Sequence, residues 1–416
     1  MSPCNCSKKQ HGILNYSLRR SMEVCVQQNR QWHHRGVLAM VFAVFVFFGF
    51  SIGANGVFWK DIMPAAGMGK ALFGELSLIS PLTAVFILLF GGPVIERIGK
   101  RIALSLGLAI LTLATFVLST VASPVHFGMV NLLYGLGYGI VEITVNSVTL
   151  DWERERGRSV MNYVHAVFCA GAVVASLIAG QLLQMRVAYA QILWGIGGIG
   201  AALALLNLML RFPASVVEEG TSDAGAAFRL LRTNSVVFTL SMIGFFAAFA
   251  EGIAITWSVL HLSNLGASAV IGGFGFALFN TVMFVGRMTN ASIVTRFGVV
   301  RSIMVSAIAI VVAGVLMSFT HSLWIAIAAF AILGFGAAGP IPTALTAGAK
   351  LVPGQNSAFS GALMSITYVS FIVCAPLIGN VAELTSLQTA LITTIVVGVC
   401  LFGFAQRLHT VSHNAV

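Results

Sequence analysis

Residues 92–101 read Gly-Pro-Val-Ile-Glu-Arg-Ile-Gly-Lys-Arg, a short charged stretch between two long apolar runs, 72–91 and 102–121. An α-helix needs about 20 apolar residues to cross the roughly 30 Å of hydrocarbon in a bilayer, and each run has about that length. Because both flanking helices would cross the membrane, the stretch between them is predicted to be a tight turn at the membrane surface.

The rest of the chain repeats this alternation of apolar runs and polar connections. The other predicted membrane-spanning helices cover residues 37–58, 125–148, 160–183, 188–210, 234–259, 268–290, 302–318, 322–346, 358–382 and 386–405. Of the 416 residues, 58% are hydrophobic and 9% are charged. Soluble domains carry about 25% charged residues, so the composition excludes an ordinary soluble domain. The fold class expected is an all-α membrane protein with twelve transmembrane helices.

Lysine and arginine are distributed unevenly between the two sides of the membrane. With the N-terminal segment placed inside, 19 of them fall in cytoplasmic segments and three, Lys60, Lys70 and Arg186, fall on the opposite side. An excess of basic residues in cytoplasmic loops sets the orientation of membrane proteins. The net charge of +10 is therefore interpreted as a topology signal, not as a nucleic-acid-binding surface. We expect both termini in the cytoplasm, and a location in the plasma (inner) membrane of a bacterium.

A polar segment midway along the chain divides the helices into two sets of six. The domains expected are a cytoplasmic N-terminal tail at 1–36, a six-helix bundle at 37–210, a cytoplasmic linker at 211–233, a second six-helix bundle at 234–405 and a cytoplasmic C-terminal tail at 406–416. The halves resemble one another, since Asn55-Gly56 matches Glu251-Gly252 and residues 96–101 match 295–301. Pseudo-symmetric repeats of this kind are typical of transporters with a midplane site between the halves.

The charged turn also carries a sequence signature. Residues 92–101 resemble the G-x-x-x-[DE]-[RK]-x-G-[RK]-[RK] motif of the major facilitator superfamily, and a degenerate copy stands at 296–301. The resemblance implies a latch for the outward-facing state, formed by Gly92, Glu96, Arg97, Gly99, Lys100, Arg101, Arg296 and Arg301. Such a latch would act on conformational change and would not bind substrate.

The fourth and fifth helices suggest a narrower similarity. Glu142-Ile-Thr-Val-Asn146, followed by Met161-Asn162-Tyr-Val-His165 and Gly171-Ala172, resembles the fucose-permease-like branch of that superfamily. Members of that branch are proton-coupled sugar symporters with an acidic residue in the fourth helix. The resemblance implies proton coupling, with Glu142 as the acidic residue.

The fourth helix also carries a stripe of polar side chains. At 100° per residue, Asn131, Tyr138 and Glu142 fall within a narrow sector, with Tyr134 and Asn146 about 60° to either side. A carboxylate that faces lipid at the midplane costs at least about 2.5–3.5 kcal/mol, so the stripe has to face protein or a water-filled cavity. These residues are candidates for substrate binding, and Glu142 for proton binding. The alternative is a Glu142 carboxylate that is hydrogen-bonded purely for packing.

A second carboxylate lies in the seventh helix. Glu251 stands among phenylalanines, and its match with Asn55 places the two side chains on opposite sides of one site. Trp257, in the same helix, could stack on a ring-shaped substrate or anchor the helix at the membrane interface. The remaining candidates for substrate contact are Asn162 in the fifth helix and Asn280 in the eighth.

Two basic side chains lie inside predicted helices. Arg287 is the only Lys or Arg committed to a membrane run, and it either extends to the interface or forms an ion pair across the bundle. His165 follows Asn162 by one turn, and it is either held structurally or joins a proton relay. The candidates for proton coupling are therefore Glu142, Glu251 and His165. The scarcity of cations near the midplane disfavours phosphate esters and dicarboxylates as substrates.

The sequence contains no Walker loop and no His/Cys cluster with metal-ligand spacing. We therefore expect no enzyme activity, catalytic residue, cofactor, metal or nucleic-acid partner, and we expect a monomer in the lipid bilayer. The function expected is a proton-coupled secondary transporter that moves a small neutral or weakly cationic organic solute, preferably sugar-like, by alternating access. The alternatives are a proton-coupled efflux antiporter for hydrophobic or cationic compounds and a non-transporting membrane receptor on the same fold.

Overall fold

The computed structural model describes residues 7–156, 160–210, 212, 224–352 and 356–413. Within these ranges the chain forms helices and turns, without a strand. In chain order the helices are α1 (Ser7–Ala65), α2 (Lys70–Ser77), α3 (Ile79–Phe90), α4 (Gly92–Ile98), α5 (Lys100–Leu118), α6 (Pro124–Arg156), α7 (Met161–Gln184), α8 (Tyr189–Met209), α9 (Ala224–Thr233), α10 (Ser235–Asn264), α11 (Ala269–Phe297), α12 (Val299–Phe319), α13 (Leu323–Ala338), α14 (Pro340–Leu351), α15 (Asn356–Leu384), α16 (Leu387–Ala390) and α17 (Thr393–His413). The all-α fold class predicted from the sequence is confirmed.

Twelve stretches of the described chain are long and apolar enough to cross a membrane. They are Gly36–Ala65, Lys70–Phe90, Lys100–Leu118, Pro124–Glu153, Tyr163–Gln184, Tyr189–Met209, Ser235–Asn264, Ala269–Phe297, Val299–Phe319, Leu323–Gly348, Phe359–Leu384 and Leu387–Val411. The first span continues to Ala65, past the predicted end at 58. Lys60 and Asp61 lower the hydropathy there, but charged side chains do not interrupt the hydrogen bonds of a helix backbone.

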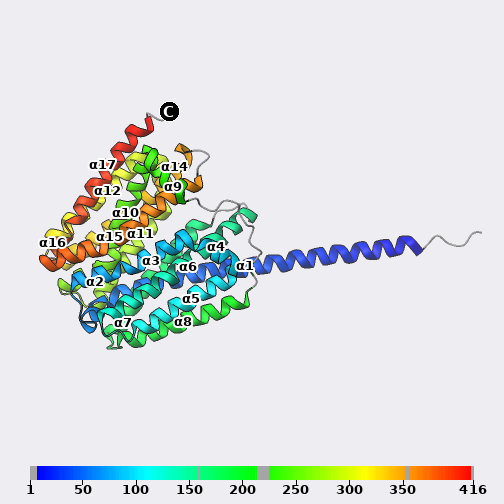
Figure 1. The fold of residues 1–416 in the computed structure, drawn as a ribbon, viewed down its shortest axis with the longest axis horizontal. Coiled ribbons are helices and arrows are strands. Elements are labelled where there is room, and N and C mark those ends of the chain that lie inside the picture. The colour runs from blue at the N-terminus through cyan, green and yellow to red at the C-terminus, as the bar shows by residue number, and fades with distance from the viewer. Residues whose placement is uncertain (1–6, 157–159, 211, 213–223, 353–355, 414–416) are drawn as a thin grey trace, which may run out of the picture.

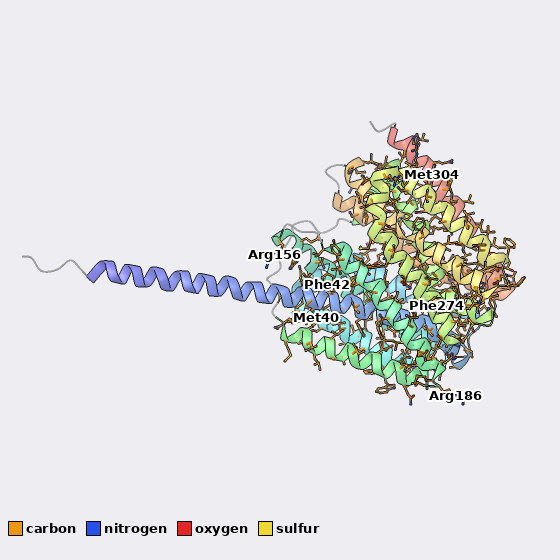
Figure 2. All side chains as sticks on the ribbon, turned by 180° about the vertical axis from the view of Figure 1, so that it is seen from behind. Met40, Phe42, Arg156, Arg186, Phe274 and Met304 are labelled. Atoms are coloured by element: carbon orange, nitrogen blue, oxygen red, sulfur yellow. The ribbon has the colours of Figure 1, made fainter. Side chains whose placement is uncertain are left out.

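The spans gather into two bundles that lie side by side (Figure 1). Helices α1–α8, drawn blue to green, form the N-terminal bundle, and α10–α17, drawn green to red, form the C-terminal bundle. The first part of α1 extends away from both bundles, and it begins at Ser7, inside the segment 1–36 that the sequence analysis treats as a tail. This extension projects from one end of the molecule, which we name the tail end. The opposite end, which carries Arg186, is the far end (Figure 2).

The two bundles repeat their helix ends at a constant spacing. Gly67 and Gly266, which follow the ends of α1 and α10, have φ values of 66° and 88° and are 199 residues apart. Gly99 and Gly298, which precede α5 and α12, have φ values of 83° and 84° and are also 199 residues apart. A positive φ is strained for a residue with a Cβ atom, so these turns favour glycine.

This spacing corrects one pairing inferred from the sequence. Asn55 and Glu251 are 196 residues apart, so Asn55 corresponds in the repeat to Ala254, and Glu251 corresponds to Ile52. The pairing was therefore wrong by three residues, about 4.5 Å along a helix axis. It rested on a neighbouring glycine and a later tryptophan, which do not determine the register, whereas the positive-φ glycines do.

Glycines bring the two bundles into main-chain contact toward the far end. A Cβ atom on Gly74 of α2 would lie 2.4 Å from the carbonyl oxygen of Ala375 on α15. A Cβ atom on Gly273 of α11 would lie 2.4 Å from the carbonyl oxygen of Ser176 on α7. No larger residue fits at either position without a shift of the backbone, so the two glycines allow main-chain contact between the helices. We name these two glycine contacts the far-end seal.

Two polar contacts join α2 to α15 beside the seal. The main-chain amide of Lys70 donates a hydrogen bond of 2.8 Å to Glu383 Oε2, and Asn380 Nδ2 donates one of 3.3 Å to Glu75 Oε1. Lys70 is the first residue of α2, and a carboxylate is favourable at the N-terminus of a helix because of the exposed amides and the helix dipole. Glu383 therefore connects the C-terminal bundle to the start of α2.

Candidate substrate and proton site

A hydrogen-bonded group ties three helices of the N-terminal bundle together. Asn55 Nδ2 on α1 donates a hydrogen bond of 3.3 Å to the hydroxyl of Tyr134 on α6. The same hydroxyl lies 3.2 Å from Thr115 Oγ1 on α5. All three side chains are buried, so these bonds replace the water that their polar atoms would otherwise bind.

Aromatic rings continue from Tyr134 along α6. The rings of Tyr134 and Tyr138 stack with centroids 5.4 Å apart, and Tyr138 stacks on Phe48 of α1 with centroids 4.4 Å apart. One turn further along α6, Glu142 Oε1 accepts a hydrogen bond from the hydroxyl of Tyr368 on α15. Because α15 belongs to the C-terminal bundle, Glu142 contacts both bundles. We name Asn55, Phe48, Tyr134, Tyr138 and Glu142 the central column.

The second carboxylate predicted from the sequence, Glu251 of α10, is paired with Arg287 of α11. Arg287 Nη2 donates a hydrogen bond of 3.1 Å to Glu251 Oε2, and Arg287 Nη1 lies 3.6 Å from Cys169 Sγ on α7. The side chains of Glu251 and Arg287 are only 10% and 22% exposed. Of the two alternatives left open by the sequence, extension to the interface and ion pairing, the structure shows the ion pair. Through Cys169, Arg287 also reaches the N-terminal bundle.

His165 of α7 lies in the same region. Its ring packs edge-on against Phe45, with centroids 5.1 Å apart, and Arg287 is near enough to act on it electrostatically. Glu251 is likewise near enough to Tyr368 for an electrostatic interaction. The two carboxylates, Tyr368, Arg287 and His165 therefore form one group between the bundles, which we name the interface cluster.

Three other amides predicted as candidates lie on α6 and α11. The side-chain nitrogens of Asn131 and Asn280 donate hydrogen bonds of 3.0 Å to the carbonyls of Phe127 and Phe276, one turn earlier in their own helices. Asn146 Oδ1 is buried and has no hydrogen-bond partner among the described residues. Leaving a buried amide oxygen unpaired costs about 1–3 kcal/mol, so Asn146 Oδ1 is a candidate acceptor for a hydrogen bond.

Trp257 and Asn162 complete the set of predicted substrate contacts. Trp257 is fully buried and its ring meets Phe73 of α2 edge-on, with centroids 5.6 Å apart. Since Phe73 belongs to the other bundle, Trp257 packs between the bundles and does not anchor α10 at the lipid interface. Asn162 lies in α7, and its side chain is outside the described part of the structure.

The charged turn predicted to act as a latch joins α4 to α5. Lys100, the first residue of α5, is buried and forms an ion pair with Asp151 near the tail end of α6. Gly99 provides the positive φ that turns the chain from α4 into α5. The pair of Lys100 with Asp151 therefore holds the turn against its own bundle.

The other predicted latch residues lie nearby or in the second copy of the turn. Gly92 begins α4. The side chains of four arginines are exposed: Arg97, Arg101, Arg296 and Arg301. The side chain of Glu96 is outside the described part of the structure. The guanidinium of Arg296 lies over the ring of Phe297, 5.4 Å from its centroid.

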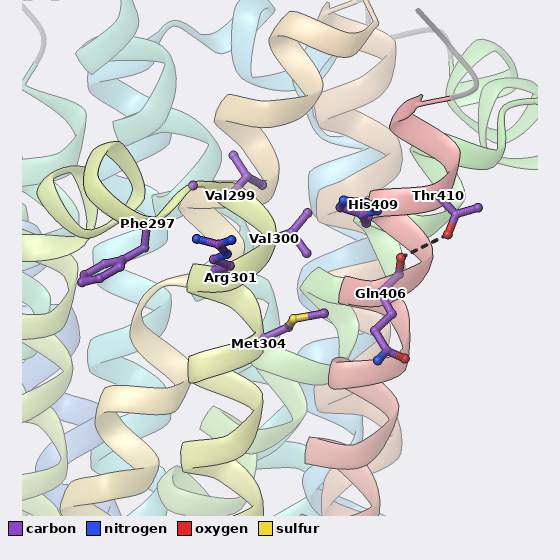
Figure 3. Close-up of a pocket in the computed structure, with 9 residues that line it drawn as sticks. Phe297, Val299, Val300, Arg301, Met304, Gln406, His409 and Thr410 are labelled. Atoms are coloured by element: carbon purple, nitrogen blue, oxygen red, sulfur yellow. Dashed lines mark hydrogen bonds between the residues drawn. The ribbon is translucent and has the colours of Figure 1, made fainter.

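A hollow of about 620 Å³ lies away from this region, between the tail-end turns of α12 and α17 (Figure 3). Its lining residues include Arg301, Met304, Gln406 and His409, none of which belongs to the central column or the interface cluster. Among the described residues, no three His, Cys, Asp or Glu side chains are grouped so that they could hold a metal ion. The central column of the N-terminal bundle, together with the interface cluster that it meets at Glu142, forms the better candidate for binding an organic solute and a proton.

A family model described as the Major Facilitator Superfamily matches residues 40–293. The chain belongs to this superfamily. An uncharacterised MFS-type transporter of Yersinia pestis is 24% identical over 347 residues, covering 82% of this chain and 88% of the relative. Membrane protein MosC of Rhizobium meliloti is 23% identical over 353 residues, covering 82% and 83%. A shorter match of 137 residues, 33% of this chain and 35% of the relative, is 25% identical to the multidrug resistance protein MdtL of Escherichia coli.

Solved structures share the fold of this major facilitator. The nucleoside transporter NupG has a TM-score of 0.69 at 15% identity, covering 92% of this chain and 98% of that chain. A bacterial homologue of the human lysosomal transporter Spinster has a TM-score of 0.74 at 16% identity, covering 92% and 98%. The Escherichia coli fucose:proton symporter FucP has a TM-score of 0.61 at 15% identity, covering 89% and 98%. The chain is thus an integral multi-pass membrane transporter and not an enzyme, as the sequence predicted.

Three side chains of this major facilitator site were missed in the sequence analysis: Tyr368, Phe48 and Cys169. Tyr368 is the one tyrosine in the eleventh predicted span, and Thr367 and Ser370 beside it are a further polar signal that could have identified it. Phe48 and Cys169 carry no such signal, because phenylalanine and cysteine are ordinary packing residues in apolar helices.

Proposed function

We propose that this member of the major facilitator superfamily couples proton movement to the transport of a small neutral or weakly cationic organic solute by alternating access. The observation that carries the proposal is the hydrogen bond from Tyr368 to Glu142. A carboxylate that contacts both bundles loses a hydrogen-bond partner when the bundles move apart and regains it when they come together. Protonation of that carboxylate can therefore shift the balance between conformations, because it changes the free energies of the two states unequally.

The surroundings of the two carboxylates favour Glu142 over Glu251 as the proton-binding group. The guanidinium of Arg287 compensates the negative charge of Glu251, so that carboxylate is balanced without a proton. The described partner of Glu142 is the uncharged phenol of Tyr368. The charge of Glu142 is therefore left to be balanced by a proton or by a cationic solute.

The central column favours a solute with a flat or ring-shaped body and hydrogen-bonding groups, sugar-like by preference. The stacked rings of Phe48, Tyr134 and Tyr138 form an aromatic wall next to Glu142, and Asn146 Oδ1, one turn beyond Glu142, is an acceptor without a partner among the described residues. Proteins named as a fucose:proton symporter and a nucleoside transporter share this fold, and both names describe ring-containing solutes.

The test is solute transport by the purified protein in liposomes. A thermal-shift screen against sugars, nucleosides, amino acids and cationic compounds first identifies a ligand, which at a hundred times its Kd should stabilise the fold by about 2.7 kcal/mol. Accumulation of that ligand in response to an imposed pH gradient supports the proposal. Transport that ignores the gradient contradicts proton coupling, and binding without any transport supports the receptor alternative.

Efflux of hydrophobic or cationic compounds by proton antiport is a second candidate. Its support is the position of Glu142 beside stacked aromatic rings, since aromatic faces and a carboxylate together attract organic cations. The partial likeness to a multidrug resistance protein also favours it. Symport and antiport differ in the direction of solute movement. When one side of the membrane is acidic, protons leave that side, so a symported solute moves away from it and an antiported solute moves toward it.

The orientation and state of the molecule are part of the same proposal. We infer that the tail end faces the cytoplasm, that both termini and the 211–233 linker lie there, and that the protein is a monomer in the bacterial inner membrane. The 19-to-3 distribution of Lys and Arg supports this orientation. With the far-end seal closed, the solute would exchange at the tail end. The turns at Gly99 and Gly298 would act as latches when the tail end closes.

A further inference from the structure

The contact between α12 and α17 changes along their length. These helices run antiparallel and are in glycine contact at two levels. A Cβ atom on Gly398 would lie 2.6 Å from Val311 Cγ2, near the middle of α12, and one on Gly314 would lie 2.8 Å from the amide nitrogen of Ile395, at the far-end start of α17. Toward the tail end, two hollows lie between the same helices. The close contact therefore reaches the level of Val311, and the two hollows lie on the outer side of the pair, from that level toward the tail end.

The hollow nearer the middle of the membrane is entirely apolar. It measures about 190 Å³ and is lined by Ile308, Val311, Val399 and Phe402. Ile308 and Val399 are exposed on the outside of the C-terminal bundle, where the candidate spans Val299–Phe319 and Leu387–Val411 would face lipid. The chemistry of this hollow suits a hydrocarbon chain.

The hollow of about 620 Å³ continues the same groove toward the tail end (Figure 3). Met304 stands one turn before Ile308 on α12, and Gln406 stands one turn after Phe402 on α17, so the two hollows follow one line along both helices. In Figure 3, Met304 points from α12 toward α17, and His409 points from α17 toward α12.

The tail-end hollow carries polar and basic groups where the inner hollow carries none. Its lining residues Arg301, Gln406, His409 and Thr410 are exposed, and no described residue of the lining is acidic. Arg407, next to Gln406, does not line the hollow, because its guanidinium lies over the ring of Phe238 on α10, 5.5 Å from the centroid. The lining groups lie at the ends of two candidate membrane spans, which is the depth of lipid phosphate groups.

We propose that this groove binds one anionic phospholipid of the leaflet at the tail end. The phosphate lies against Arg301 and accepts a hydrogen bond from the side-chain amide of Gln406, and an acyl chain lies along Ile308 and Phe402. Basic pockets between transmembrane helices attract anionic headgroups, each nearby cation contributing about 1 kcal/mol. An apolar hollow in line with the basic one adds contacts that a free phosphate ion cannot make.

The experiment is native mass spectrometry of the full-length chain in detergent, titrated with phosphatidylglycerol and with phosphatidylcholine of identical acyl chains. The first phosphatidylglycerol should bind more tightly than the first phosphatidylcholine. Arg301→Gln should weaken phosphatidylglycerol binding about fivefold, the factor that corresponds to about 1 kcal/mol for one cation, and should leave phosphatidylcholine unchanged. Val399→Trp, which places an indole in the apolar hollow, should weaken both lipids, and Val399→Phe provides a smaller change in case the indole disturbs folding.

Two matched substitutions control for general effects of charge and bulk. Arg232→Gln removes an exposed cation from α9, and Val312→Trp places an indole on the exposed face of α12 next to the groove. Neither should change lipid binding. Equal affinities for the two lipids, or equal effects of Arg301→Gln and Arg232→Gln, overturn the proposal. Binding of inorganic phosphate as tight as that of the lipid, or a dimer that forms in place of the lipid-bound monomer, assigns the groove to another occupant and overturns it as well.

Discussion

The hydroxyl of Tyr368 on α15 donates a hydrogen bond to the carboxylate of Glu142 on α6, across 226 residues of sequence and from one bundle to the other. Separation of the bundles at this level would remove that bond. Glu142 would then need another partner, which a proton or a solute can supply. Proton binding and solute binding can in this way respond to the same movement.

Replacement of Glu142 by Gln should abolish accumulation driven by a pH gradient. Gln keeps the shape and an acceptor for Tyr368 but cannot bind and release a proton, so exchange at equilibrium and solute binding should persist. The measurement is uptake into proteoliposomes with and without the gradient. Glu251→Gln removes the other carboxylate and should keep its response to the gradient when uptake is expressed per amount of folded protein, since loss of the partner of Arg287 lowers stability. If Glu142→Gln accumulates solute as the unaltered protein does, Glu142 is not the coupling site.

Loss of Arg287 should destabilise the fold, because Glu251 would be left as an unpaired buried charge. Breaking a buried ion pair from one side costs about 3–5 kcal/mol, so Arg287→Met should lower the stability in chemical denaturation by that order. Adding Glu251→Gln to Arg287→Met removes the orphaned charge and should restore part of the loss. A double variant no more stable than Arg287→Met alone would show that the pair is not the cause.

Gly99→Val should impair the transport cycle while solute affinity changes little. The substitution has free space, since nothing lies within 4 Å of a Cβ atom there, but a φ of 83° costs a residue with a Cβ atom about 1–2 kcal/mol. Gly195→Val is the matched control, because its Cβ also meets nothing within 4 Å and no positive φ is required. The readouts are transport rate and ligand affinity. Equal losses of affinity and rate for Gly99→Val would contradict a purely conformational role.

Cross-linking α2 to α15 at the far end should stop transport. With Glu75→Cys and Asn380→Cys, a short bifunctional thiol reagent should join residues whose native side chains are 3.3 Å apart, and so hold the far-end seal closed. Cleavage of the linker should restore transport. Each single cysteine variant, treated with the same reagent, is the control. Unchanged transport in the cross-linked protein would show that the far end does not need to open.

A thiol probe tests the orientation of the chain. Ser222, in the central linker and outside the described residues, should be labelled as Ser222→Cys from the cytoplasmic side only. The expectation follows from the excess of Lys and Arg on the tail side. Labelling by an impermeant reagent added to intact cells would reverse the proposed orientation.

The helices could be predicted from the sequence because each must satisfy the length and apolarity that a bilayer demands. The tenth span illustrates the limit of that reasoning. Apolarity predicts one helix over 322–346, whereas the chain breaks between α13 and α14 at Gly339, just before Pro340. Hydropathy does not record where a backbone turns. The misplaced match of Asn55 with Glu251 has a different cause, since it was aligned on a neighbouring glycine and a later tryptophan and not on the positive-φ glycines.

The candidate site was predictable as a set of residues but not as a set of pairs. A carboxylate in an apolar helix stands out, so Glu142 and Glu251 could be found. Which neighbour pairs with each carboxylate depends on how helices pack, between the bundles for Glu142 and within the C-terminal bundle for Glu251. Tyr368 reaches Glu142 and Arg287 reaches Glu251 through contacts between helices that no sequence period encodes.

The far-end seal consists of glycines against main-chain carbonyls, and the central column consists of aromatic rings, one amide and a carboxylate. Changes of residue type in the column therefore leave the seal intact. Under the proposed function, gene duplicates of such a chain could acquire new solutes by substitutions at Phe48 or Tyr138, while Gly74 and Gly273 keep the far-end seal unchanged. Selectivity and mechanics can evolve at separate positions.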